Sequence, residues 1–481
     1  MFLFRLKNIF FSMKAIDVVS VSSGILENLV FAGIIYGWPS LQYMLMKEEY
    51  FQEQCNNTNS TPLHNETGFQ KMNFCPEMMN TFNLAFTLAI AFQNFSSLLF
   101  GLIIDRYGTW MMRSVATGLY SLAFILLSAM TAQTSWLLFP ASIFLAVGGL
   151  QMQVSNMQLG NLSKSFRSVI ITMVAGAFDS GALTFLLMKM VYEVRVKSQT
   201  IMIVMTCMTV VPWLRTFLLM PEKTVPFPVP HDYRYGMLKS CQGKRSRNLP
   251  DKFSNDTPDS ETSDENQNEK GLKACLQNKL FWSNLLYFCV GNLQFVFFVG
   301  SFVKWLETIF PLDEDISFYT TLLSFVLLAG IVVAPLNGAL TDGVIKIKKR
   351  FAPETAVFHG FLASTATASS FSILLSISVL ATSVHTSVVL ALMFRAFLYS
   401  GIANFLAQTF PTKHFGKLYG ISATAAGLTS FLQYALFQLS SIFDPTFKTA
   451  YYILLCCNIL ALAHPLLIGT NLWQWRKPEK T

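Results

Sequence analysis

Residues 101–113 read GLIIDRYGTWMMR, a short polar stretch between two apolar runs. Gly101 and Asp105 are four residues apart, so they share one face of a helix. A glycine lets a neighbouring helix approach closely, and Asp105 is then expected to meet that helix near its N-terminus or at an arginine. Arg106 and Arg113 add positive charge beside it. The stretch is therefore predicted to act as a gate, where two neighbouring helices come together or separate.

A second, degenerate copy of this stretch, GALTDGVIKIKKR, occupies residues 338–350. Gly338 and Asp342 repeat the spacing, but Gly343 stands where the first copy has a basic residue, and four basic residues follow. Two copies predict a fold of two related halves, each with a gating loop that does not contact substrate. The alternative is two unrelated helix ends with interfacial charges.

Long apolar runs dominate the rest of the chain. It is 52% hydrophobic and 13% charged, whereas soluble domains carry about 25% charged residues. A helix of roughly 20 apolar residues crosses a bilayer. About twelve runs reach that length, so the sequence predicts an all-α membrane protein with about twelve transmembrane helices. The runs are 15–38, 78–104, 112–132, 136–160, 168–190, 199–219, 280–306, 316–341, 355–380, 385–409, 416–441 and 447–470.

The first run is expected to remain as a span rather than to be cleaved as a signal peptide. It is longer than a signal core, contains Glu27 and Asn28, and is followed by GWPS (37–40), which we interpret as a helix-ending turn. If the N-terminus lies inside, 26 of the 35 lysines and arginines fall in inside segments. Because cytoplasmic loops carry the excess of basic residues, both termini are predicted to be cytoplasmic.

The loop over residues 39–77 then lies outside. It contains Cys55 and Cys75, and an oxidising compartment favours a disulfide between them. It also contains three N-x-S/T acceptor motifs for glycosylation. The acceptor residues are Asn56, Asn59 and Asn65.

A polar segment divides the chain into two sets of six runs. Residues 1–220 form the N-terminal half and residues 280–481 the C-terminal half with a short tail. Between them, 221–279 begins with Pro-rich sequence and continues with charged residues, so it is predicted to be a partly disordered cytosolic loop. Six spans, a linker and six spans resemble the layout of the major facilitator superfamily, in which G-x-x-x-D-R-x-G follows the second span.

Enzyme chemistry is not expected. The chain contains no P-loop, no H-E-x-x-H and no G-x-S-x-G motif, and its six histidines are scattered. No cofactor, metal, nucleic acid or obligate protein partner is predicted. The expected partners are a small-molecule substrate and the lipid bilayer, which we take to be the plasma membrane.

Five stretches resemble solute carrier family 43 of that superfamily, and the resemblance covers nearly the whole chain. They are GIIYGWPSL (33–41), GAFDSGALTFLLMK (176–189), RTFLLMP (215–221), YRYG (233–236) and TFPTKHFGKLYG (409–420).

The AFDS, LLMP and Y-x-Y-G residues within these stretches resemble the nucleobase branch of the family. Its other branch carries large neutral amino acids and has an uncharged residue in place of Asp179. The chain departs from the nucleobase pattern at GALTDG. The resemblance implies facilitated, sodium-independent uniport of purine bases such as adenine, guanine and hypoxanthine.

A purine needs an aromatic face for stacking and polar groups along its edge. In the fold that the resemblance implies, spans one, four, seven and ten line the cavity, with five, eight and eleven beside them. Polar residues in spans also often only bond neighbouring helices, at about 0.6 kcal/mol each. The candidate substrate-binding residues are Glu27, Asn28, Phe31, Asn156, Gln158, Phe178, Asp179, Asn292, Gln294, Arg395 and Tyr399.

Charged residues within spans mark transport pathways or internal pairs. Asp179 is therefore expected either to accept hydrogen bonds from a base or to neutralise Arg395 across the two halves. Glu27 is another conceivable partner, and its own alternative is a protonated carboxyl within the first helix bundle.

Two other functions fit part of the pattern. A carrier of large neutral amino acids would use Asp179 for the substrate ammonium and Arg395 for its carboxylate. A receptor or scaffold without transport would signal through the central loop, but it has no need for buried charges or for two gating loops.

Overall fold

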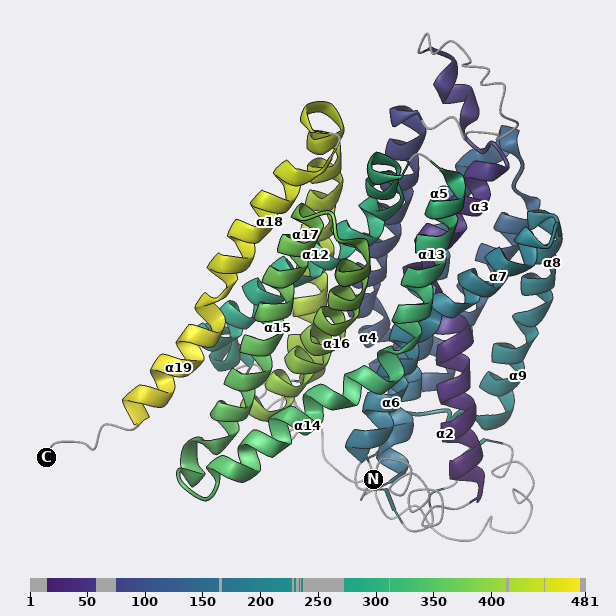
Figure 1. Cartoon of the computed structure of the whole chain (residues 1–481). Helices are drawn as coiled ribbons and strands as arrows, with labels where there is room; N and C mark the ends of the chain where they lie inside the picture. The colour runs from purple at the N-terminus through teal and green to yellow at the C-terminus, as the bar shows by residue number, and fades with distance from the viewer. Residues whose placement is uncertain are drawn as a thin grey trace, which may run out of the picture.

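The computed structural model is a bundle of helices (Figure 1). It describes residues 15–57, 75–163, 167–226, 229–230, 233, 235–236, 272–310, 312–411, 415–444 and 446–475. Within those ranges no residue is in a β-strand. The acceptor residues Asn59 and Asn65 lie outside the described residues, as does most of the central loop 221–279.

Helices of the first half occupy one side of the bundle and those of the second half occupy the other (Figure 1). The first half comprises α2 (Ala15–Glu27), α3 (Trp38–Lys47), α4 (Pro76–Ala129), α5 (Leu138–Met157), α6 (Arg167–Asp179), α7 (Leu183–Glu193), α8 (Ser198–Met208) and α9 (Val210–Leu219). The second half comprises α12 (Lys279–Ile309), α13 (Asp313–Leu328), α14 (Gly330–Lys348), α15 (Ala356–Leu380), α16 (Val384–Thr409), α17 (Phe415–Phe443), α18 (Lys448–Ala461) and α19 (Ala463–Trp475).

Eleven helical stretches of the described residues are long and apolar enough to cross a bilayer. The predicted all-α membrane architecture is thereby confirmed. Among the runs predicted from the sequence, α17 is absent from these eleven. At 29 residues it is long enough to span, but polar side chains such as Gln433 and Gln438 interrupt its apolar sequence.

The first span differs from the prediction because it does not end at GWPS. A π-helical turn (Asn28–Ala32) and a 3₁₀ turn (Ile34–Gly37) lead directly into α3. Pro39 lies in the first turn of α3, where a missing backbone N–H breaks no helical bond. Helical structure therefore continues to Lys47, into the predicted loop 39–77, while Ala15–Ala32 is the part that is long and apolar enough to cross a bilayer.

Close backbone contact with the fifth span explains where the first span breaks. The fifth span is itself interrupted by a 3₁₀ turn (Ser180–Ala182) between α6 and α7. A Cβ added to Gly33 would lie 1.7 Å from the Phe178 carbonyl oxygen, and one added to Gly181 would lie 2.5 Å from the Gly33 Cα. Only glycine at both positions lets these two broken helices cross so closely.

The predicted eighth span, 316–341, is likewise broken, at Ala329 between α13 and α14. Breaks free backbone polar groups that need partners in a membrane. The Ser180 hydroxyl is the partner of two of these groups. It donates to the Leu328 carbonyl at 2.8 Å and accepts from the Ile331 N–H at 3.1 Å. One side chain of the first half therefore stabilises a helix break in the second.

The stretch 101–113 lies inside α4, which bends at Gly108. Gly108 has φ +84°, and a Cβ there would lie 2.5 Å from the Glu222 carbonyl. Only glycine adopts this conformation at little cost. The bend joins the second and third spans and rests on the start of the central loop.

Several gating predictions concern close contacts that this conformation does not contain. A Cβ added to Gly101 or Gly338 would have no atom within 4 Å among the described residues. Asp342 and Arg106 are exposed, and the Asp105 side chain lies outside the described part of the chain. Arg113, predicted to add positive charge beside Asp105, is fully buried instead.

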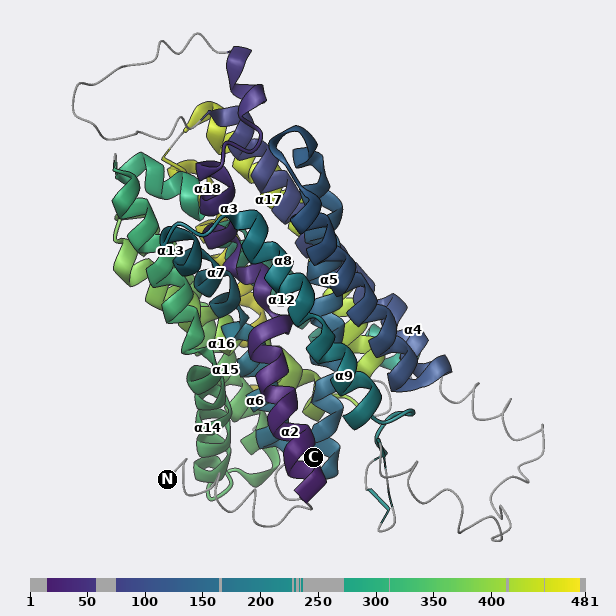
Figure 2. The same ribbon diagram turned by 90° about the vertical axis from the view of Figure 1, so that its right-hand side faces the viewer.

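The two halves meet at the end of the bundle that carries Cys55, which we call the disulfide end. Figure 2 shows α3, α7 and α13 together there. The Ser40 and Ser324 hydroxyls are 3.1 Å apart, and Asn83 donates to the Gly300 carbonyl at 3.0 Å. Contact at this end leaves the glycines near the opposite end without close neighbours. The predicted disulfide between Cys55 and Cys75 is confirmed.

Candidate functional site

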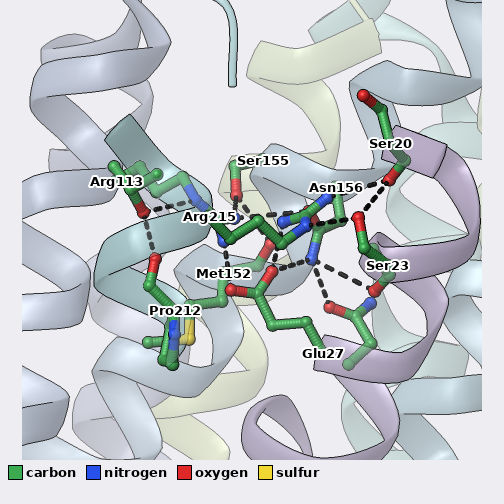
Figure 3. Close-up of polar contacts among 12 residues, drawn as sticks. Ser20, Ser23, Glu27, Arg113, Met152, Ser155, Asn156, Pro212 and Arg215 are labelled. Carbon is green, nitrogen blue, oxygen red and sulfur yellow. Dashed lines mark hydrogen bonds and ion pairs between the residues drawn. The ribbon is translucent and has the colours of Figure 1, made fainter. Parts of the chain in front are cut away.

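A buried charged cluster occupies the interior of the first half (Figure 3). The Glu27 carboxylate accepts from both Arg113 and Arg215. We call these three residues the charged clamp. Arg113 comes from α4, Arg215 from α9 and Glu27 from the end of α2, so the clamp ties three spans of one half together. The clamp carries two positive charges and one negative charge.

All three residues of the clamp make further hydrogen bonds to neighbouring side chains. Arg113 also donates to Thr216 at 2.9 Å and to Ser155 at 2.8 Å. Arg215 donates to Ser23 at 3.0 Å, and Asn156 donates to the Glu27 carboxylate at 2.9 Å. Buried charges with this many partners stabilise helix packing and have little capacity left for a ligand.

Four sequence-predicted binding residues are therefore occupied within the first half. Glu27 and Asn156 belong to the clamp network, and Asn28 bonds Asn156 at 2.7 Å and the Val174 carbonyl at 3.0 Å. Gln158 accepts from Thr109 at 3.0 Å and from the Val225 N–H at 3.4 Å. These contacts hold helices and the start of the central loop, so we remove these four residues from the candidate list.

Phe31 is also a packing residue in this structure. Its ring packs edge-on against Tyr120, with centroids 6.0 Å apart, and only 4% of its surface is exposed. It is therefore a core residue of the first half.

Two amides of the second half are similarly occupied. Gln294 donates to the Ser372 carbonyl and to Ser376 at 2.8 and 2.9 Å, and accepts from Asn458 at 2.8 Å. Asn292 donates to Ser430 at 3.2 Å and accepts from Tyr399 at 2.7 Å. Asn292 thus acts on the centre of the molecule only through Tyr399.

The remaining predicted charges meet at the interface of the two halves. Arg395, in the middle of α16, donates from Nε to Asp179 at 2.8 Å. We call Asp179 and Arg395 the central pair. Asp179 is the last residue of α6, directly before the break in the fifth span. Its side chain is 10% exposed, whereas that of Arg395 is 1% exposed. The Asp179 side chain therefore keeps a small accessible surface, whereas the Arg395 side chain keeps almost none.

Aromatic rings surround the central pair. The Arg395 guanidinium carbon lies 3.6 Å from the Tyr36 ring centroid, 4.6 Å from that of Phe295 and 5.5 Å from that of Tyr399. Phe178 packs edge-on against Tyr36 at 5.8 Å. The rings come from both halves. This arrangement combines flat apolar surfaces with a polar pair, which suits a planar, polar-edged solute.

Sequence reasoning did not name Tyr36, Gln93 or Ser180, although all three belong to this centre. Tyr36 lies inside the quoted stretch GIIYGWPSL, and Ser180 follows Asp179 directly. These two stretches indicated the family, but nothing in them indicated that Tyr36 and Ser180 lie beside the central pair. Gln93 had no sequence signal.

Comparisons with known proteins identify the family of the chain. Residues 72–468 match the Major Facilitator Superfamily. Equilibrative nucleobase transporter 1 of Bos taurus is 31% identical over 96% of this chain and 98% of its own. Large neutral amino acids transporter small subunit 3 of Mus musculus and of Homo sapiens are each 23% identical over 86% of both chains.

A solved structure shares the fold. The crystal structure of an auto inhibited POT family peptide transporter aligns with TM-score 0.53 at 14% identity, covering 96% of this chain and 98% of that one. At that identity the match shows the fold alone. With the family match and the relatives above, the chain is a membrane transporter rather than an enzyme, and it belongs to solute carrier family 43 of the major facilitator superfamily.

Proposed function

We propose that this transporter is a facilitative, sodium-independent uniporter of purine nucleobases, such as adenine, guanine and hypoxanthine, in the plasma membrane. The observation that carries the proposal is the central pair, which joins the two halves inside a set of aromatic rings. The name of the bovine relative supports the same substrate class.

The chemistry of the site matches a neutral, flat solute. Tyr36 and Phe295 are 3% and 0% exposed in this conformation, so they and Tyr399 offer ring faces to a base once the two halves move apart, and the Asp179 carboxylate accepts hydrogen bonds from base N–H groups. Because Arg395 neutralises Asp179, the site has no net charge to be balanced by a charged substrate. A neutral base can then cross without a coupled ion.

Alternating access follows from where the pair lies. Asp179 belongs to the first half and Arg395 to the second, so any rocking of the halves changes their separation. The halves are joined at the disulfide end in this conformation. A bound base that bridges Asp179 and Arg395 would keep both charges partnered while the contacts at that end open and the opposite end closes.

The second candidate substrate is a large neutral amino acid. Its carboxylate would bind Arg395 and its ammonium would bind Asp179, and the mouse and human relatives carry that name. In its favour, a zwitterion and the central pair have complementary charges. Against it, the bovine relative with the nucleobase name is 31% identical to this chain, whereas the mouse and human relatives are each 23% identical.

Uptake of labelled adenine and labelled leucine, each with and without sodium, tests the proposal in cells that express the chain. We expect adenine uptake above that of vector-only cells, unchanged when sodium is replaced by choline. Leucine uptake without adenine uptake would favour the amino-acid reading. Uptake of neither, at confirmed surface expression, would contradict transport of both classes.

We also propose that both termini are cytoplasmic and that the loop with Cys55 and Cys75 is extracellular and glycosylated at Asn56, Asn59 or Asn65. A glycosidase treatment should increase gel mobility of the wild type. The shift should disappear when all three asparagines are changed to glutamine. A shift that persists in the triple variant would contradict this topology.

A further inference from the structure

Two buried polar atoms without partners lie on residues that contact Tyr36. The Gln93 carboxamide oxygen and the Arg395 Nη1 atom have no hydrogen-bond partner among the described residues. Gln93, in α4, is 2% exposed and Arg395, in α16, is 1% exposed. One atom is an acceptor and the other a donor, and they come from opposite halves.

Neither side chain is free to find another partner by rotating. The Gln93 amide nitrogen donates to the Tyr36 hydroxyl at 3.0 Å. The backbone carbonyl of Gln93, a separate group, accepts from the Ser96 hydroxyl at 2.7 Å, and Ser96 accepts from Gln151 at 3.0 Å. Arg395 is held through Nε by Asp179 at 2.8 Å. Buried polar groups of native proteins are almost always paired, so a polar partner from outside the chain is expected here.

Because Gln93 and Arg395 both contact the one Tyr36 side chain, a small flat ring with a donor and an acceptor at neighbouring positions of one edge is the simplest solute that could satisfy both atoms. Adenine does so with its 6-amino group and N1, and a 6-oxopurine does so with N1–H and O6. In each case one group can donate to Gln93 and the other can accept from Arg395. Tyr36 contacts both residues: its ring centroid is 3.6 Å from the Arg395 guanidinium carbon and its hydroxyl accepts from Gln93 at 3.0 Å.

We propose that Gln93 determines specificity by accepting a hydrogen bond from the N–H group at or beside position six of the bound purine. This proposal rests on the proposed function and names the edge of the base that the site recognises. Arg395 Nη1 donates to the neighbouring acceptor, N1 or O6. The site then selects purines with a hydrogen-bond donor on that edge.

The test compares adenine with 6-methylpurine, which keeps N1 but replaces the amino group by a methyl group of similar size. Unlabelled compounds compete with labelled adenine for uptake. In the wild type, we expect 6-methylpurine to inhibit roughly ten- to hundred-fold more weakly than adenine, the effect of one lost hydrogen bond to a buried group. Equal inhibition by the two compounds in the wild type would overturn the proposal, without any variant.

Gln93→Met then removes the acceptor while keeping an unbranched side chain of similar length. We expect the difference between adenine and 6-methylpurine to fall below about three-fold, because adenine loses its bond and 6-methylpurine had none. Gln42→Met is the matched control: Gln42 is also buried, and its amide donates to Met79 sulfur. The control should keep the wild-type ratio.

A purely structural role of Gln93 gives a different result. Gln93→Met would then weaken adenine and 6-methylpurine by the same factor and leave their ratio unchanged, which contradicts the proposal. Failure of the proposed function is separable, because cells that take up no labelled adenine give no signal for competition at all.

Discussion

The charged clamp and the central pair are both buried ion clusters in spans, yet they differ in almost every other respect. The clamp lies within the first half, and both oxygens of Glu27 bind arginines. The central pair joins the two halves through one hydrogen bond and leaves Arg395 Nη1 without a partner in the described part of the chain. A saturated cluster within one rigid half stabilises packing. An incompletely paired cluster between the two halves still has a donor to offer to a substrate, as we propose.

The largest effect is expected for Glu27→Gln, which tests whether the charged clamp is purely structural. The change leaves Arg113 and Arg215 buried without a counter-charge, which costs about 3–5 kcal/mol. We expect loss of surface expression and a large fall in the melting temperature in detergent. Glu193→Gln is the control, because the Glu193 side chain is 44% exposed. Normal expression of Glu27→Gln with selective loss of transport would mean that the clamp binds substrate after all.

Asp179→Asn tests the other cluster and should act on transport. A carboxylate that contacts the base loses part of its accepting capacity, so affinity should fall about ten- to hundred-fold. The loss should differ between adenine and hypoxanthine, which present opposite donor and acceptor patterns at position six. Competition for uptake measures it.

If Asp179 only neutralises Arg395, the outcome of the same change is different. All bases then lose uptake equally through poor expression, and Arg395→Gln in the same chain restores it. That rescue would place the central pair with the clamp as a structural feature.

Lys189 is a fourth buried cation and shares features with both clusters. It crosses between the halves, as Arg395 does, and it donates to the Ser317 carbonyl at 2.6 Å, to Thr320 at 2.8 Å and to Thr321 at 2.9 Å. Lys189→Met removes these bonds at the disulfide end. That end should open more often, by about ten-fold if roughly 1.4 kcal/mol is lost.

Labelling of Ser40→Cys by a membrane-impermeant thiol reagent measures that opening, because Ser40 lies at the contact between the halves. The labelling rate should rise in Lys189→Met and stay constant in Lys47→Met, which removes an exposed lysine at the same end. An unchanged rate in Lys189→Met would show that its bonds do not hold the halves together.

The smallest effect is expected at the rim of the clamp, which we define as Asp17, Ser20 and Tyr235; the Ser20 carbonyl accepts from Arg215 at 3.1 Å. Tyr235 donates to Asp17 at 2.9 Å and bonds Ser20 at 3.1 Å, and burial raises the pKa of Tyr235, so the hydroxyl stays protonated at neutral pH. Tyr235→Phe should cost about 0.5–1.5 kcal/mol, a small fall in melting temperature with transport unchanged. Tyr107→Phe, at a 62% exposed residue, should leave the melting temperature unchanged. A loss as large as that of Glu27→Gln would mean that the rim and the interior of the clamp act as one unit.

Much of the architecture was predictable from the sequence because it depends on local composition. Apolar runs of sufficient length become helices in a bilayer whatever they pack against, so the helical spans were predicted. The pairing of Cys55 with Cys75 followed from two cysteines in one loop. The breaks in the first, fifth and eighth spans were not predicted, because they arise where Gly33, Gly181 and Ser180 meet other helices.

The sequence by itself determined that this chain is a helical membrane protein of two halves with carboxylates in its spans. Only the tertiary structure decided what each carboxylate does. Glu27 and Asp179 look alike in sequence, since each is an acid within an apolar run. Glu27 meets two arginines of its own half, whereas Asp179 meets one arginine of the other half and has a side chain that is 10% exposed. The role of a buried charge depends on its partners, and those partners lie 86 to 216 residues away in the chain.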